Sequence, residues 1–300
     1  MKLKELSWIA AALALVVPFT TASAQETATL VGSDTCIQCH SEQAASFNGS
    51  MHGKKLPIVK GMAADKTCET CHGAGSLHAA AAGDKTNPGF ATIKNPAKLD
   101  PQATAKICFT CHKNKEVMLW GTSTHSRNGL TCTKCHSVHN GQGLNNLKLS
   151  ANDTCLQCHK NQKADSHLPS HHPVAEGKMN CVDCHNPHGG PNGNLRGETV
   201  NETCYKCHAE KAGPYAFEHP PVAENCTICH KPHGSVNEYL LKQPMPMLCL
   251  RCHKLEHTNI GTNGGSTVYG ESAATLSKYY RCTDCHWQIH GSDRSPGMGH

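Results

Sequence analysis

All twenty cysteines of this 300-residue chain lie within ten copies of the pentapeptide Cys-x-x-Cys-His. This pentapeptide is the attachment signal for c-type haem, in which both thiols bond to the porphyrin and the histidine becomes an axial iron ligand. The cysteines are Cys36, Cys39, Cys68, Cys71, Cys108, Cys111, Cys132, Cys135, Cys155, Cys158, Cys181, Cys184, Cys204, Cys207, Cys226, Cys229, Cys249, Cys252, Cys282 and Cys285. The motif histidines are His40, His72, His112, His136, His159, His185, His208, His230, His253 and His286. The sequence therefore predicts ten covalently attached haem c groups, each with one iron.

Other uses of a Cys-x-x-Cys pair do not account for this pattern. A zinc site needs four ligands in a closed set and gives no reason for a histidine directly after the second cysteine ten times. A disulfide framework would show varied cysteine spacings, as small secreted scaffolds do. Haem attachment explains every cysteine and the histidine that follows each pair.

The remaining histidines predict the second axial ligands. The chain has 23 histidines, and ten of them belong to the motifs, which leaves thirteen. Ligation of every iron by two imidazoles would use ten of these. The candidates are His52, His78, His125, His139, His172, His188, His219, His233, His257 and His290. We expect His167 and His300 to be surface residues. One open or methionine-ligated iron is the alternative, because the chain also has eight methionines.

Alternate motifs reveal an internal repeat of about 47 residues. Residues 108–139, 155–188 and 204–233 share one layout. Each has a motif, a spacer with an isolated histidine, a second motif, and a histidine three residues further on. Two units carry Pro-His-Gly at that last position. A repeated two-haem unit predicts an array in which each unit contacts its neighbours.

Composition supports the same fold class. Aromatic residues make up only 5% of the chain, and long apolar runs are absent after the N-terminal segment. Ten porphyrins would supply the missing apolar mass, so the chain should not fold without haem. We expect a multihaem cytochrome c fold, mostly irregular with short α-helices and negligible sheet. The ten haems should form an elongated quasi-linear array built on the dihaem repeats.

The N-terminus resembles a secretory signal. Lys2 and Lys4 precede a short apolar stretch from residue 8 to 17, and Ala22-Ser23-Ala24 fits a cleavage site. The apolar stretch is shorter than the roughly 20 residues that a membrane helix needs. We therefore expect residues 1–24 to be a cleaved signal peptide and residues 25–300 to be one decahaem cytochrome domain in the periplasm or beyond it.

The formal charge of +5 does not indicate nucleic-acid binding. Removal of residues 1–24 deletes two lysines and one glutamate, which leaves +4. Each oxidised haem adds about −1 through its two propionates, so the loaded protein should carry about −6. The lysines are scattered along the sequence rather than clustered.

Most of the candidate second ligands fall into two classes according to their position within the repeat. His125 and His219 each lie seven residues before the next motif, and His139, His188 and His233 follow a motif. At the ends, His52, His78, His257 and His290 are the candidates near their motifs. One position is ambiguous, because aligning residues 174–176 on residues 222–224 matches His171, rather than His172, to His219.

Several segments resemble the MtrA/DmsE/PioA-type decahaem cytochromes over essentially the whole chain after residue 24. The segments are Asn186-Pro187-His188-Gly189, Cys207-His208-Ala209-Glu210-Lys211, Glu218-His219, Val222 to Cys226, and His290-Gly291-Ser292. In that family the liganding position is a His-Pro pair nine residues before the cysteine, which favours His172. The extra His167, His171 and His300 depart from the family pattern.

The resemblance implies a periplasmic electron conduit between the periplasm and the cell exterior. It implies an outer-membrane β-barrel partner of the MtrB/PioB type, an extracellular multihaem cytochrome or reductase, and periplasmic or inner-membrane cytochromes as redox partners. Six-coordinate irons leave no substrate site, so we expect an electron-transfer protein and not an enzyme. The alternatives are a soluble periplasmic shuttle that donates to a reductase, and a multihaem reductase with one open haem.

Overall fold

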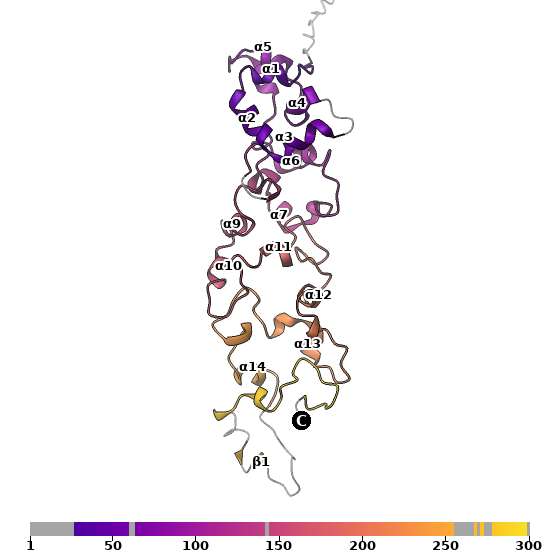
Figure 1. The fold of residues 1–300 in the computed structure, drawn as a ribbon, viewed down its shortest axis with the longest axis vertical. Coiled ribbons are helices and arrows are strands. Elements are labelled where there is room, and N and C mark those ends of the chain that lie inside the picture. The colour runs from indigo at the N-terminus through magenta and orange to yellow at the C-terminus, as the bar shows by residue number, and fades with distance from the viewer. Residues whose placement is uncertain are drawn as a thin grey trace, which may run out of the picture.

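The computed structural model describes residues 27–59, 64–141, 144–254, 267–268, 271–272 and 278–298. The molecule is elongated, and the chain progresses along its long axis from the N-terminal helices at one end to the C-terminal residues near the other (Figure 1). The predicted signal peptide, His257 and His300 lie outside the described residues.

Short helices separated by irregular segments make up most of the regular structure. The α-helices are α1 (Ser33–Ile37), α2 (Ser41–Gly49), α3 (Met51–Lys55), α4 (Thr67–His72), α5 (Ser76–Ala80), α6 (Pro101–Cys108), α7 (Thr124–Arg127), α8 (Cys132–Cys135), α9 (Ala151–Leu156), α10 (Lys160–Asp165), α11 (Cys181–Cys184), α12 (Val200–Tyr205), α13 (Pro220–Glu224) and α14 (Met247–Leu250). The 3₁₀ turns are η1 (Leu56–Ile58), η2 (Ala64–Lys66), η3 (Pro88–Thr92), η4 (Trp120–Thr122), η5 (Leu144–Asn146), η6 (Ala209–Lys211), η7 (Cys226–Ile228), η8 (Glu238–Leu240) and η9 (Cys282–Asp284). The strands β1 (Thr267–Val268) and β2 (Glu271–Ser272) pair antiparallel, with Thr267 opposite Ser272.

Capping residues fix where the helices that lead into motifs begin. Asp100 accepts a hydrogen bond from the backbone N–H of Ala103 at 2.9 Å at the start of α6. Before α12, the Thr199 hydroxyl accepts from the N–H of Glu202 at 3.0 Å, and the Glu202 carboxylate accepts from the N–H of Thr199 at 3.3 Å. Such caps satisfy the N–H groups of the first turn that have no partner within the helix.

The protein part of the molecule has almost no apolar core. Among the residues that the structure describes, the buried apolar side chains are Leu56, Ala81, Trp120 and Leu241. No helix in these described ranges is both long enough and apolar enough to span a bilayer. So few buried side chains cannot offset the conformational entropy lost on ordering the chain, and the haem groups must therefore form the interior.

Candidate haem-binding sites

Each described motif forms a single helical turn. The N–H of the motif histidine bonds to the carbonyl of the first motif cysteine, for example at 3.0 Å from His40 to Cys36 and 2.8 Å from His286 to Cys282. This turn gathers the two thiols and the imidazole at one place on the backbone, which is what attachment to a porphyrin edge and its iron requires.

Nine of the motif histidines face a second histidine ring. The pairs, with the distances between ring centroids, are His40–His78 at 6.2 Å, His72–His139 at 6.1 Å, His112–His52 at 5.8 Å, His136–His188 at 6.0 Å, His159–His125 at 6.1 Å, His185–His233 at 5.9 Å, His208–His172 at 6.3 Å, His230–His290 at 6.2 Å and His253–His219 at 6.0 Å. The motif histidine His286 lies among the described residues, but His257 does not.

These distances fit an iron between each pair of rings. An imidazole nitrogen binds a first-row metal at about 2.0 Å, so two opposed ligand nitrogens lie about 4 Å apart. Adding about 1 Å from each nitrogen to its ring centre gives roughly 6 Å between centroids, in agreement with all nine pairs. The donor set therefore fits haem iron with two axial imidazoles.

Backbone carbonyls orient many of these imidazoles. Nδ1 of His125 lies 2.9 Å from the Pro187 carbonyl oxygen, and Nδ1 of His172 lies 2.8 Å from that of Pro232. The other contacts of this kind are His72 with Lys94, His78 with Phe90, His136 with Asn145, His139 with Gln43, His219 with Ile289, His230 with Tyr239 and His286 with Gly297. An Nδ1–H that donates to a carbonyl leaves the Nε2 lone pair free for a metal.

Burial keeps many of these rings neutral. It lowers the pKa of seven histidines of the pairs: His52, His72, His136, His185, His188, His233 and His290. The neutral imidazole is the form that binds a metal, so burial prepares these side chains for ligation.

The histidine pairs interlock successive units. We define a unit as two successive motifs, namely residues 36–72, 108–136, 155–185, 204–230 and 249–286. The histidine between the motifs of one unit faces the first motif histidine of the next unit, as in His52–His112, His125–His159, His172–His208 and His219–His253. The histidine after the second motif of a unit faces back to the second motif histidine of the preceding unit, as in His139–His72, His188–His136, His233–His185 and His290–His230.

The histidines near the ends were candidates by their position in the sequence, and the structure shows which motif histidine each described one faces. His52 faces His112 of the second unit, and His290 faces His230 of the fourth unit. Only His78 faces a motif histidine of its own unit, among the pairs that the structure describes. Sequence proximity fails because contacts between units, rather than within them, build the array.

The structure brings His172, and not His171, to the first motif histidine of the next unit. Nδ1 of His171 hydrogen-bonds to the carbonyl of Leu168, and its Nε2 lies 2.8 Å from a carboxylate oxygen of Glu176. The hydrogen bond with Glu176 raises the pKa of His171. Both ring nitrogens of His171 are thus engaged away from His208.

Glycines after three of the back-facing histidines allow close contact between units. Gly234 has φ +155°, and a Cβ atom there would lie 1.9 Å from the carbonyl oxygen of Asp165. At Gly189, with φ +109°, it would lie 2.6 Å from the carbonyl oxygen of Leu119. Ser235, the next residue after Gly234, forms an antiparallel bridge with Ser170, which lies two residues before His172. The Pro-His-Gly signature therefore marks where two ligand-bearing segments meet.

The cysteines show that successive motifs are neighbours in space. First cysteines lie within hydrogen-bonding reach inside every unit, as in Cys36–Cys68, Cys108–Cys132, Cys155–Cys181, Cys204–Cys226 and Cys249–Cys282. Second cysteines lie close between units, as in Cys71–Cys111, Cys135–Cys158, Cys184–Cys207 and Cys229–Cys252. These contacts alternate without a gap, so the ten attachment sites follow each other in chain order.

Two pairs of first cysteines also change each other's acidity through a hydrogen bond between their thiols. The hydrogen bond from Cys108 lowers the pKa of Cys132 to about 7, and that from Cys155 lowers the pKa of Cys181 to about 7. The same two hydrogen bonds raise the pKa of Cys108 and of Cys155. In the folded arrangement, the two thiols of each of these pairs therefore differ in acidity.

Two asparagines hold the motifs of a unit together. Asn201 lies three residues before Cys204, and its Oδ1 accepts from the N–H of Cys226 at 2.7 Å. Its Nδ2 donates to the carbonyls of Val222 at 2.8 Å and Ala223 at 3.1 Å. In the third unit, Asn152 accepts from the N–H of Cys181 at 3.0 Å in the same way, and its Nδ2 donates to the carbonyls of Val174 at 3.3 Å and Met179 at 3.0 Å.

Sequence reasoning did not identify these asparagines, although a signal was present. The segments 33–36, 152–155 and 201–204 read Ser-Asp-Thr-Cys, Asn-Asp-Thr-Cys and Asn-Glu-Thr-Cys. The Ser33 hydroxyl takes part in the first unit, where it accepts from the N–H of Cys68 at 3.4 Å. The repeated polar residue three positions before a motif thus bridges to the next motif.

A buried carboxylate organises the N-terminal unit. Glu69 is 5% exposed and accepts from the N–H groups of Val31 at 3.0 Å, Gly32 at 2.9 Å and Gly75 at 2.9 Å. Burial alone would raise the pKa of Glu69, but the three backbone donors outweigh it and hold the pKa below its usual value. The ionised side chain therefore ties the first motif to the second.

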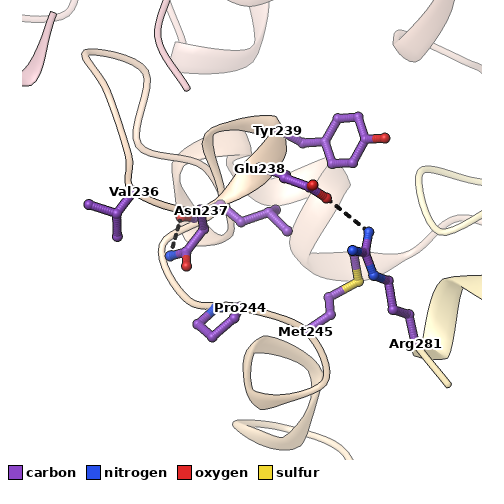
Figure 2. A pocket seen from close by; sticks show the side chains of 8 residues that line it. Val236, Asn237, Glu238, Tyr239, Pro244, Met245 and Arg281 are labelled. Atoms are coloured by element: carbon purple, nitrogen blue, oxygen red, sulfur yellow. Dashed lines mark hydrogen bonds and ion pairs between the residues drawn. The ribbon is translucent and has the colours of Figure 1, made fainter. Parts of the chain in front are cut away.

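A hollow of about 240 Å³ lies beside the loop that follows the eighth motif (Figure 2). The loop from Val236 to Leu241 borders it, together with Pro244, Met245 and Arg281. Arg281 bridges to Glu238 at 2.9 Å across the hollow, and it directly precedes Cys282. The hollow thus lies where the segments leading into the ninth and tenth motifs meet the loop after the eighth motif.

Comparisons with known proteins agree with this geometry. The family model for a doubled CXXCH motif matches residues 125–164, 171–213 and 219–258. The chain is also 36% identical to "Multiheme cytochrome MtrA" of Shewanella baltica (strain OS185) over 273 residues, which is 89% of this chain and 80% of that protein.

Proposed function

The chain belongs to the MtrA-type multihaem c-type cytochromes, electron-transfer proteins with covalently bound haem c, and from this premise we propose that it conducts electrons across the outer membrane. In this proposal the chain lies within a membrane barrel and links the periplasm to the cell exterior. The observation that carries the proposal is the order of the attachment sites, which follow one another along an elongated molecule (Figure 1).

The proposed axial ligands are the ten motif histidines and the ten histidines predicted to complete them. Nine pairs of facing rings support this assignment, and we assign His257 to the tenth iron with His286. Haem supplies a one-electron couple when it is bound. The histidines hold the sites at fixed positions, and two imidazoles per iron leave no position for a substrate. We therefore propose electron transfer without substrate chemistry.

The length of the haem array supports the proposed location inside a membrane barrel. A bilayer has a hydrocarbon core of about 30 Å, which a row of sites along an elongated protein can bridge. Exposed polar backbone and charges cannot face lipid, so a barrel of the MtrB/PioB type would have to enclose the chain. An extracellular multihaem cytochrome or reductase would stand at one end, and periplasmic or inner-membrane cytochromes at the other.

Liposomes test this function directly. The holoprotein and a candidate barrel are reconstituted together in vesicles that enclose a redox dye, and a membrane-impermeant reductant is added outside. Conduction predicts dye reduction far faster than with the barrel alone or with the cytochrome added to barrel-free vesicles. Equal rates in all three preparations, together with barrel-free redox exchange between the cytochrome and a soluble partner, would instead support the periplasmic shuttle.

A further inference from the structure

Within the nine facing pairs, the Nδ1 atom of His52 has a side-chain amide, and not a backbone carbonyl, at hydrogen-bonding distance. Nδ1 of His52 lies 2.7 Å from Nδ2, the side-chain amide nitrogen of Asn146. Asn146 is buried, with 9% of its surface exposed. The two residues lie 94 positions apart in the sequence, so this contact joins the first unit to the loop after the fourth motif.

The backbone around Asn146 serves the neighbouring site as well. Asn145 and Asn146 both adopt left-handed conformations, each with φ 57°. The Asn145 carbonyl lies 2.9 Å from Nδ1 of His136, and the Asn146 carbonyl accepts from the N–H of Ser137 at 2.8 Å. The turn at Asn145 and Asn146 therefore contacts the fourth motif through its backbone. Through the side chain of Asn146 it contacts His52, the proposed second ligand of the third haem.

The same turn recurs after the eighth motif with a different side chain. Tyr239 and Leu240 have φ 55° and 59°, and the Tyr239 carbonyl lies 2.8 Å from Nδ1 of His230. The Leu240 carbonyl accepts from the N–H of Lys231 at 2.7 Å, as the Asn146 carbonyl does from Ser137. Leucine thus fits the second position of this turn. The turn itself does not require the amide of Asn146, which leaves its contact with His52 as the specific role.

The chemistry of a ligating imidazole fixes the sense of this hydrogen bond. An imidazole that binds iron through Nε2 carries its proton on Nδ1 and donates it. The two ends of an asparagine amide have the same shape, so a half-turn of the amide, which exchanges Nδ2 for Oδ1, presents an acceptor to that proton in the haem-bound protein. An acceptor at Nδ1 makes the imidazole a stronger donor to the metal, which favours the ferric over the ferrous state.

We propose that Asn146 is a positioning residue that orients His52 and lowers the reduction potential of the third haem, the one attached at Cys108 and Cys111. This inference rests on the proposed His112–His52 ligand pair. At this site the Asn146 side chain would orient the ligating imidazole, as backbone carbonyls do at other sites.

Three variants of the holoprotein test it: Asn146→Leu, Asn146→Asp and, as the matched control, Leu240→Asn. Each is titrated potentiometrically, with low-spin haem signals followed by electron paramagnetic resonance. Loss of one ordinary hydrogen bond predicts that Asn146→Leu raises the ferrous-to-ferric ratio of one haem in ten about fivefold at a fixed potential. Asn146→Asp keeps an acceptor and should leave that ratio unchanged or lower it. Leu240→Asn should change no haem.

Unchanged midpoints in a ten-haem, fully low-spin Asn146→Leu protein would overturn the role of Asn146. If Asn146→Leu does not load ten haems, the Asn146→Asp variant decides the question. A higher reduction potential of the third haem in Asn146→Asp contradicts the proposal, and a lower one supports it. His52→Met separates this result from failure of the ligand assignment. If His52→Met leaves all ten haem spectra as in the parent protein, His52 is not a ligand and the proposed ligand set fails instead.

Discussion

Replacement of Asn201 by alanine should loosen the contact between the seventh and eighth motifs without disturbing the other units. The residue is 6% exposed, and its side chain makes four hydrogen bonds. The strongest constraint is the 2.7 Å bond to the backbone N–H of Cys226, because in alanine nothing replaces the acceptor. The two carbonyls that Nδ2 serves lose a donor, but water can reach carbonyls more readily.

The magnitude follows from the stranded N–H group. A buried donor left without a partner costs about 1–3 kcal/mol, so we take about 2 kcal/mol for Cys226. A loss of about 2 kcal/mol raises the equilibrium constant for local opening roughly 30-fold. Hydrogen exchange of the Cys226 amide should therefore accelerate by that factor, because exchange reports the local opening free energy.

Hydrogen–deuterium exchange of the reduced holoprotein, read from proteolytic peptides, measures this effect. Asn152→Ala is the reciprocal control, since Asn152 holds the N–H of Cys181 in the same way. Each variant should accelerate exchange at its own site and leave the other site unchanged. Acceleration of both sites by either variant, or of neither site, would refute the local account.

Three further outcomes are expected. His172→Ala should convert one haem in ten to a high-spin state in electron paramagnetic resonance, whereas His171→Ala should leave every haem low-spin; a spectrum changed only by the second variant would reverse the assignment. Glu69→Gln should destabilise the N-terminal unit at neutral pH, as measured by limited proteolysis. The pKa of Glu69 is lower in the folded than in the unfolded protein, so its stabilisation is present above the unfolded pKa and is lost as pH falls through the folded pKa. The stabilities of variant and parent should therefore converge in acid. A difference in stability that stays constant with pH would contradict this. Gly234→Ala should force its Cβ against the Asp165 carbonyl and weaken ligation by His233, seen as one altered haem, while Gly193→Ala, with no atom within 4 Å of the added Cβ, should alter none.

The sequence predicts the attachment chemistry well because that chemistry resides in adjacent residues. A Cys-x-x-Cys-His turn needs no distant partner, so all ten sites could be read from the sequence. The partner of a distal histidine depends on how units meet, which is why spacing alone did not link His52 to His112 or His290 to His230. The carbonyls that orient the imidazoles carry no side-chain signal at all. The repeat did predict that His125 and His219 occupy equivalent positions, and each faces the first motif histidine of the following unit.

With the proposed signal peptide, which would export the chain from its N-terminus, the interlocked pairs would impose an order on the assembly of the sites. The distal histidines His125, His172 and His219 precede the motif histidines that they face, so those sites can close as soon as their motif emerges. The motif histidines His72, His136, His185 and His230 must wait for a partner in the following unit. In this proposed order, each new unit would supply the histidine that completes the second site of the unit before it. A chain cut between units would therefore keep that unfinished site exposed at its end.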